Sequence, residues 1–198
     1  MKIHNVKIEK ETVLKFLGYK NREVTPYINK VIDEEIENIN NILDIEVYIN
    51  EINKDIHNFS GEYVRSCFEN SEKAYAVLYT IGSKIEEKIL YYTNNNDMIR
   101  AMVLDKIGIV ALDYVGEEIK KYLKKETDIN IYCELYPGDK GFEVKNQCII
   151  YEYVKNNNIS INEYGQMTPI KSVALVVCLS SQCEKKGSRC DRCLNKCF

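Results

Sequence analysis

The stretch INEYGQMTPIKSVALVVCL, residues 161–179, gives the clearest indication of fold class in this sequence. Its second half, from Ser172 onward, is a nearly continuous apolar run of strand length, and residues 159–165 also have a strand pattern. A second apolar run, AYAVLYTIG at 74–82, ends at a glycine. Runs of this kind are typical of strands buried in a sheet. The sequence therefore predicts a sheet that contains both runs.

Helical patterns surround these strands. Apolar residues at spacings of three and four predict a helix that Thr25 caps and Pro26 begins. Ser83 opens a capping-box pattern, and Asp97 is placed to cap a longer helix that runs to about residue 123. The residues expected on the inner face of the helix after Ser83 are Ile85, Ile89 and Leu90. Further strands are expected at 45–49 and 129–135, and further helices at 61–70 and 143–154. Because helices and strands mix without regular βαβ alternation, the predicted class is α+β.

Composition limits the classes of protein to which the chain can belong. It has 198 residues, of which 45% are hydrophobic and 29% charged, and its formal net charge is −3. This balance argues against a domain built mainly to bind nucleic acid, and no apolar run is long enough to span a membrane. The first residues do not resemble a secretory signal, so we expect a cytoplasmic protein. We predict one domain at residues 1–180 and a cysteine-rich tail at 181–198.

Cysteine is the unusual feature of the composition, because five of the eight lie within the last 21 residues. Thiolates at this spacing favour zinc or an iron–sulfur cluster, and the spacing does not decide between them. The alternatives are free thiols and disulfides. Cys178 is either a further thiol of this group or part of the core, and a buried structural thiol is expected at Cys67, Cys133 and Cys148. The candidate metal ligands are Cys183, Cys190, Cys193 and Cys197.

Several blocks of the sequence, in order, resemble the reactivation domain of cobalamin-dependent methionine synthase in its stand-alone form. The signature at Met167–Val173 is the most similar, and the block at Tyr136–Phe142 resembles the Pro-Gly-Tyr turn of that family. The segments at 13–20, 80–89 and 104–119 resemble its opening segment, its strand-to-helix segment and its long helix. The resemblance implies a twisted, mainly antiparallel sheet with flanking helices. It covers the chain from about Val13 to Leu179.

The resemblance also implies a ligand and a partner. In that family the domain binds S-adenosylmethionine and caps a cobalamin-binding domain, while a flavodoxin- or ferredoxin-like donor supplies the electron that reduces oxidised cobalamin. The cofactor-binding positions that carry over are Asp113, Glu134, Pro137, Gly138 and Asp139. Glu134 stands where the family has an arginine that clamps the ligand carboxylate, and Asp139 where it has a tyrosine. Lys171 and Ser172 are candidates for contact with a phosphate or a corrinoid side chain, with a solvated lysine as the alternative.

Two functions follow as expectations. The first is a stand-alone partner of a corrinoid-dependent methionine synthase or related methyltransferase, which supports reductive reactivation of cobalamin with S-adenosylmethionine as methyl donor. The second is an iron–sulfur or zinc-binding accessory protein that keeps the fold and has lost S-adenosylmethionine binding. A plain interaction module with neither ligand is a third alternative. With only two histidines in the chain, catalysis by a histidine base is not expected.

Overall fold

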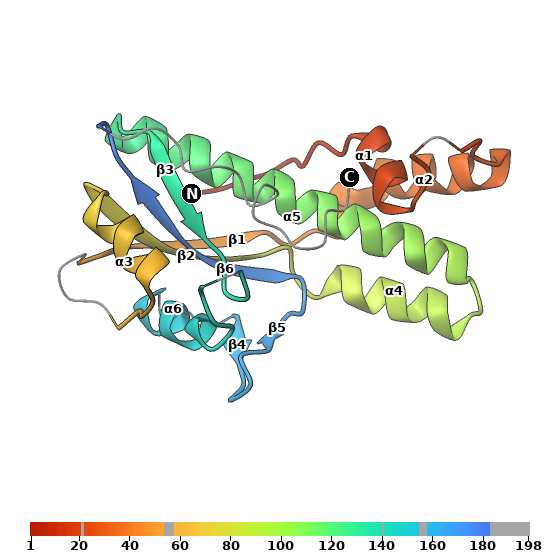
Figure 1. Cartoon of the computed structure of the whole chain (residues 1–198). Helices are drawn as coiled ribbons and strands as arrows, with labels where there is room; N and C mark the ends of the chain where they lie inside the picture. Colours follow the sequence, from red (N-terminus) through yellow and green to blue (C-terminus); the bar gives the residue numbers. More distant parts are fainter. Residues whose placement is uncertain (21, 54–57, 140, 155–157, 183–198) are drawn as a thin grey trace.

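The computed structural model describes residues 1–20, 22–53, 58–139, 141–154 and 158–182. A four-stranded antiparallel sheet in the order β1-β2-β6-β3 forms its centre (Figure 1). These strands are β1 (Glu46–Ile52), β2 (Lys73–Thr80), β3 (Ile131–Leu135) and β6 (Ser172–Leu179). A small hairpin of β4 (Ser160–Ile161) and β5 (Met167–Thr168) precedes β6. The predicted α+β class and the antiparallel sheet are confirmed.

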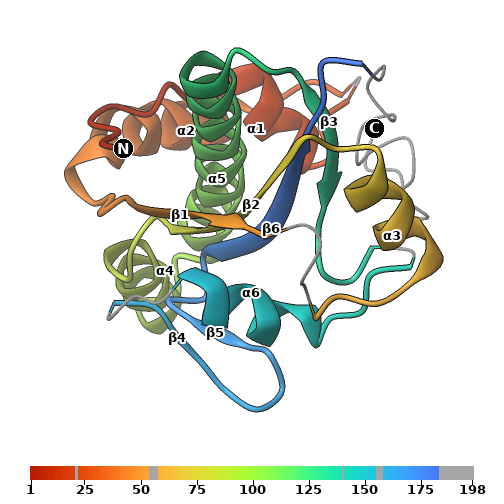
Figure 2. The same ribbon diagram turned by 90° about the vertical axis from the view of Figure 1, so that its left-hand side faces the viewer.

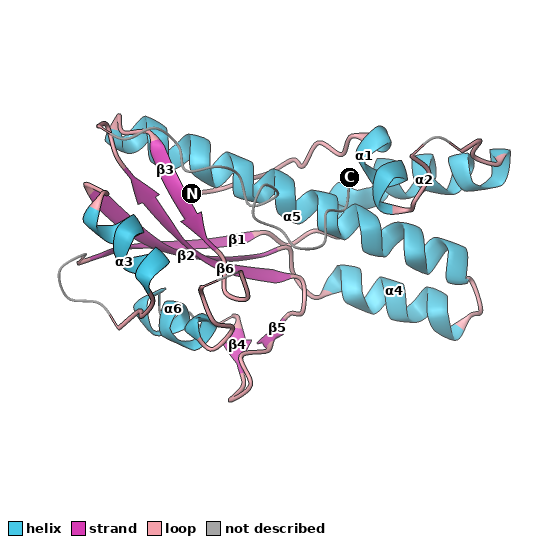
Figure 3. Cartoon of the chain, in the orientation of Figure 1, coloured by secondary structure: helices cyan, strands magenta, loops and turns pink. Residues whose placement is uncertain are grey.

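Helices cover both faces of the sheet, as Figures 2 and 3 show. The helices α1 (Lys10–Phe16), α2 (Pro26–Asn38), α4 (Lys84–Asn94) and α5 (Met98–Thr127) share a core with one face, and the turn η1 (Ile39–Asn41) follows α2. The helices α3 (Glu62–Glu69) and α6 (Asn146–Val154) share a core with the other. Along β2, Val77 packs into the first core and Leu78 into the second. A strand buried on both faces is apolar at every position, which explains the continuous runs in the sequence.

The longest helix, α5, extends past the end of the sheet. Its 30 residues span about 45 Å, whereas a strand of eight residues spans about 26 Å. Lys171, directly before β6, lies against Gly108, so residues 98–107 project beyond the sheet. There α4 packs alongside α5, and the two form a helical hairpin that extends past the sheet beside α2 (Figure 1).

Two glycines inside α5 allow this helix to pack closely against its neighbours. A Cβ atom at Gly108 would lie 2.7 Å from Lys171 Cδ, and one at Gly116 would lie 2.9 Å from the hydroxyl of Tyr79. The Tyr79 hydroxyl donates to the carbonyl oxygen of Leu112 at 3.2 Å. Glycine in mid-helix lowers helix stability by roughly 1 kcal/mol relative to alanine. Here it provides the space that these two side chains occupy.

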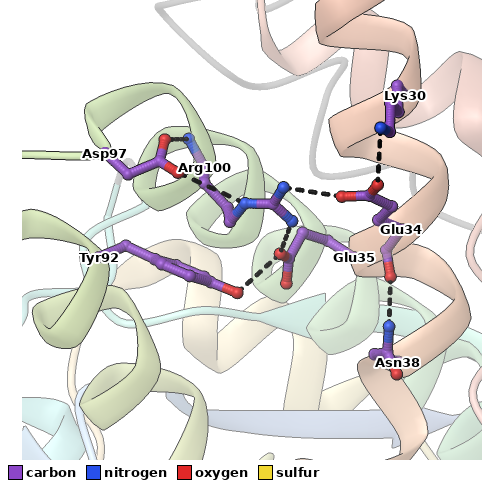
Figure 4. Close-up of polar contacts among 7 residues, drawn as sticks. All are labelled: Lys30, Glu34, Glu35, Asn38, Tyr92, Asp97 and Arg100. Carbon is purple, nitrogen blue, oxygen red and sulfur yellow. Dashed lines mark hydrogen bonds and ion pairs between the residues drawn. The ribbon is translucent and has the colours of Figure 1, made fainter. Parts of the chain in front are cut away.

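A cluster of charged residues holds α2 against the hairpin (Figure 4). Arg100 donates at 2.7 Å to Glu35 Oε1 and at 2.7 Å to Glu34 Oε2. The hydroxyl of Tyr92, on α4, also donates to Glu35 Oε1, at 2.8 Å. Asp97 caps α5 by accepting a hydrogen bond from the backbone nitrogen of Arg100 at 3.1 Å. We call Glu34, Glu35, Tyr92, Asp97 and Arg100 the charged clamp. It joins three helices.

The predicted helix starts are partly confirmed. Thr25 caps α2 and Asp97 caps α5, as expected. The helix after Ser83 is present, but the capping box is wrong, because Ser83 has helical backbone angles and its hydroxyl donates to Glu87 instead. The inward orientation predicted for Leu90 is also wrong. This residue is 59% exposed, because it lies about 100° around α4 from the inward-facing Ile89.

Three cysteines meet within the core. Cys67 of α3, Cys133 of β3 and Cys178 of β6 are buried, and Cys133 lies opposite Cys178 in the sheet. Hydrogen bonds with Cys178 and Cys67, together with burial, raise the pKa of Cys133 far above its usual value. Buried protonated thiols of this kind are unreactive. The prediction for Cys148 is wrong, because this residue is partly exposed and faces the turn after β4.

The cysteine-rich tail, including Cys183, Cys190, Cys193 and Cys197, lies outside the described residues. Within the described part of the chain, no group of three or more His, Cys, Asp or Glu residues is arranged to hold a metal ion. Among the same residues, no helix has both the length and the apolar composition needed to cross a bilayer.

Candidate functional site

Glu134 lies near the end of the edge strand β3, and its carboxylate faces α5. The side chain is 9% exposed. Both carboxylate oxygens lie 3.4 Å from Lys120 Nζ, and the hydroxyl of Tyr136 donates to Oε2 at 2.9 Å. The position that matches an arginine in the resembled family is therefore a buried acid, and a lysine from the helix lies against it.

Lys120 connects this acid to a second one. Its Nζ donates to Glu117 Oε1 at 2.5 Å, one helical turn away on α5. Burial opposes the charge on Lys120, but the neighbouring carboxylates of Glu117 and Glu134 outweigh it, so the pKa of Lys120 lies above its ordinary value. The lysine therefore stays protonated at neutral pH and its charge is shared between two carboxylates.

The turn after β3 has the geometry that its sequence predicts. The backbone nitrogen of Asp139 donates to the carbonyl of Tyr136 at 3.0 Å, and the nitrogen of Gly138 donates to the carbonyl of Phe142 at 2.7 Å. Gly138 has a φ of 97°, which favours glycine, and Pro137 precedes it as expected of a turn. The half-buried Asp139 completes the turn beside the end of β3.

Asp113 lies on the exposed side of α5, one turn before Glu117. Residues four apart on a helix share one face, so Asp113, Glu117 and Lys120 form a single stripe along α5. The candidate site therefore consists of this stripe, Glu134 and Tyr136 on β3, and the turn at Pro137–Asp139. It has four carboxylates and one ammonium group, an arrangement that suits a cationic ligand better than an anionic one.

Lys171 and Ser172 do not belong to this group. Lys171 Nζ donates to Asp105 Oδ1 at 2.8 Å, its side chain lies against Gly108, and its backbone nitrogen donates to Glu86 at 2.8 Å. The hydroxyl of Ser172 donates to the carbonyl oxygen of Pro169 at 2.6 Å. Gly108 and Lys120 are twelve residues apart, about 18 Å along α5, so Lys171 is distant from Glu134. The prediction that Lys171 and Ser172 contact a phosphate or a corrinoid side chain therefore concerns a place apart from the Glu134 group.

Sequence reasoning missed Lys120, Glu117 and Tyr136. The spacing of Glu117 and Lys120 indicates a pair on one helix face, and the alternation of Glu134 and Tyr136 places them on one side of a strand. Neither pattern indicates that the helix pair and the strand pair face each other. That information comes only from the packing of α5 against the edge of the sheet.

No family model and no curated protein matches this sequence. Among solved structures, the crystal structure of the MetH reactivation domain bound to AdoHcy is similar to this chain, with a TM-score of 0.60 and 10% sequence identity. The match covers 94% of this chain and 82% of that one. Identity this low shows a shared fold and no more. The chain therefore has the fold of the MetH reactivation domain.

Proposed function

We propose that this protein is an accessory of a corrinoid-dependent methyltransferase and supports reductive reactivation of cobalamin with S-adenosylmethionine as the methyl donor. The observation that carries the proposal is the fold shared with the MetH reactivation domain over 94% of this chain. The protein would bind and orient a ligand beside a cobalamin-binding partner, and the partner's cofactor would supply the chemistry. A flavodoxin- or ferredoxin-like protein would supply the electron.

The residues of the candidate site fit S-adenosylmethionine only in part. This ligand has two cationic groups, the sulfonium and the amine, and one carboxylate. The carboxylates of Asp113 and Glu117 suit the cationic groups, while the ligand carboxylate would meet Glu134 where the family has arginine. Lys120 does not compensate for this change, because it already lies between Glu117 and Glu134. We therefore derive no methyl-transfer step from this site.

Two ligands that differ by one charge test the fit. S-adenosylmethionine and S-adenosylhomocysteine are nearly equal in size, and only the first has the sulfonium. Calorimetric titration of the full chain should give at least about fivefold tighter binding of S-adenosylmethionine, about 1 kcal/mol, if the carboxylates contribute. Glu117→Gln should reduce this preference, and the matched Glu163→Gln, at an exposed turn position, should leave it unchanged. Absence of binding by either ligand would contradict the S-adenosylmethionine part of the proposal.

The corrinoid part needs its own measurement. A cobalamin-binding subunit in the cobalt(II) state, with an electron donor and S-adenosylmethionine, should gain methylcobalamin faster when this protein is added. The visible absorption of the corrinoid reports the change directly. If the rate of methylcobalamin formation is unchanged at saturating protein although the protein binds S-adenosylmethionine, the corrinoid part of the proposal is wrong and the ligand part stands.

A second candidate function rests on the contacts of Glu134 with Lys120 and Tyr136. These contacts favour a protein that has kept this fold and lost the ability to bind S-adenosylmethionine. We propose for that case a metal-binding accessory in which Cys183, Cys190, Cys193 and Cys197 hold an iron–sulfur cluster or zinc. Anaerobic purification followed by metal analysis and a visible spectrum tests it. A colourless protein with one zinc excludes the cluster, and a metal-free protein excludes both.

A further inference from the structure

One edge of the central sheet has no neighbouring strand among the described residues. The strand β1 pairs only with β2, and its seven residues do so in continuous register from Glu46 to Ile52. In an antiparallel pair, alternate residues of a strand direct their backbone N–H and C=O groups away from the partner. Within the described part of the chain, no backbone group outside β2 forms a hydrogen bond with the backbone of β1. The outward groups are therefore open to pairing with another strand.

The edge at β1 lacks the features with which proteins usually protect the edge of a sheet. Lysine, proline and bulges discourage pairing with a further strand. The sequence of β1, EVYINEI, contains neither lysine nor proline, and its register with β2 contains no bulge. The opposite edge differs, because β3 has five residues and its register with β6 is irregular between Ile131 and Cys133. Of the two edges, β1 is the longer and the more regular.

A cavity of about 490 Å³ lies along β1, with walls that include Tyr122 of α5 and Val154 of α6. Three consecutive residues of β1 line it: Val47, Tyr48 and Ile49. Val47 and Ile49 pack with the core on the α5 side of the sheet, and Tyr48 packs with the core on the α6 side (Figure 2). The cavity therefore follows the edge of the sheet and contacts both faces. An added strand suits this shape, because its side chains would also alternate between the faces.

The charges around the cavity favour a positively charged occupant. Glu126 of α5 lines it, and no lysine, arginine or histidine is among the described residues of the lining. The hydroxyl of Tyr48 donates to Glu46, and the hydroxyl of Tyr75, also in the lining, donates at 3.4 Å to Glu51. Burial and these carboxylates raise the pKa of both tyrosines. A second copy of β1 would bring the same acids against these, whereas a basic peptide complements them.

We propose that the edge of β1 binds an extended, basic peptide segment of a partner protein, which adds to the four-stranded sheet as a further strand. Backbone hydrogen bonds with β1 would provide affinity, and the alternating side chains would provide specificity. On the α5 side, an apolar side chain would pack against Val47 and Ile49, and a lysine or arginine would reach Glu126. This edge is opposite to the one that contains Glu134, so the inference does not rest on the proposed function.

A displayed library of random nonapeptides, selected on the immobilised full chain, provides the probes. The enriched peptides should contain lysine or arginine, and labelled copies should bind with a micromolar Kd in fluorescence polarisation. Methylation of the backbone nitrogens at alternate residues tests the pairing. One alternate set should weaken binding at least about tenfold, because it removes the N–H groups that face β1, and the other set should have little effect.

The variant Glu126→Lys tests the role of charge. At low ionic strength it should weaken binding of the basic peptides at least about threefold. The matched control is Glu163→Lys, at an exposed turn position outside the lining of the cavity, and it should leave binding unchanged. Circular dichroism would confirm that both variants fold.

Several results would overturn the proposal. A library that yields no enriched peptide shows that the edge does not accept a strand, and binding that tolerates methylation of both alternate sets shows that the peptide does not pair with β1. Enriched peptides without basic residues, or binding that is equal in wild type and Glu126→Lys, contradict the assigned chemistry. Sedimentation velocity provides the remaining arm, because a dimer of the wild type that the peptides dissociate would place a second copy at this edge.

Discussion

Replacing Arg100 by methionine tests whether the charged clamp stabilises the contact between α2 and the projecting hairpin. Methionine keeps an unbranched apolar chain and removes the guanidinium. The Glu35 side chain, 4% exposed, then loses its ion-pair partner and keeps only the hydroxyl of Tyr92. Removing one partner of a buried ion pair costs about 3–5 kcal/mol. Because Arg100 is 22% exposed and water reaches it, we expect the lower end, about 3 kcal/mol.

Urea denaturation monitored by circular dichroism measures this loss. For a domain of this size, about 3 kcal/mol corresponds to a fall in Tm of roughly 6–12 °C. The double variant Arg100→Met/Glu35→Leu should recover most of the stability, to within about 1 kcal/mol of the wild type, because apolar side chains can replace a buried ion pair. Recovery would show that the isolated charge of Glu35, and not the lost packing of Arg100, causes the loss.

The matched control is Lys121→Met on α5. Lys121 pairs with Glu118 at 2.8 Å, but its side chain is 71% exposed, so its loss should change the free energy of unfolding far less than the loss of Arg100 does. If Arg100→Met were no more destabilising than Lys121→Met, the reasoning from burial would be refuted. A double variant that is less stable than Arg100→Met alone would refute it as well.

Three further changes test other contacts. Burial and the hydrogen bond to Glu35 raise the pKa of Tyr92 to about 12. The stabilisation from the protonated hydroxyl should therefore be complete below pH 10 and disappear as pH rises through 12. Ultraviolet titrations of the wild type and of Tyr92→Phe should differ in that range. Gly116→Ala should destabilise by about 1–3 kcal/mol because its methyl group meets the Tyr79 hydroxyl, and adding Tyr79→Phe should restore part of the loss in thermal unfolding. Lys171→Met should raise the pKa of the Asp105 carboxyl in an NMR titration, and the stability that this pair contributes in the wild type should disappear as pH falls below the ordinary value of 3.8.

Local chemistry explains which elements could be predicted from the sequence. Thr25 and Asp97 cap their helices as predicted, because a cap needs only the side chain and the next few backbone nitrogens. The pattern at Ser83 has the same local form and fails as a cap. Its glutamate, Glu86, accepts the backbone nitrogen of Lys171, 85 residues away, which is a contact that no local pattern describes.

The features that could not be predicted from the sequence depend on packing partners that are distant along the chain. Gly108 and Gly116 are unfavourable in a helix when considered alone. They are explained only by the folded structure, in which the side chains of Lys171 and Tyr79 occupy the space that a Cβ atom would need. The strand predicted after residue 159 is longer than the two residues of β4. The tight turn at Asn162–Gln166, with Gly165 at a φ of 83°, ends it early, because the chain must reverse to form β5.

The acid at position 134 shows how the structure changes the meaning of a sequence difference. From sequence, a glutamate in place of an arginine removes one contact to a ligand carboxylate. In the fold, Glu134 is one part of an ion-pair group with Lys120 and Glu117, so the difference extends to the helix that faces it. A single Glu134→Arg change would leave Lys120 paired with Glu117 alone and place two cations side by side, whereas Lys120→Glu with Glu134→Arg would preserve the balance of charge. The charge around Glu134 therefore depends on α5 and β3 together, and a motif confined to β3 and its turn describes only the residues of the strand.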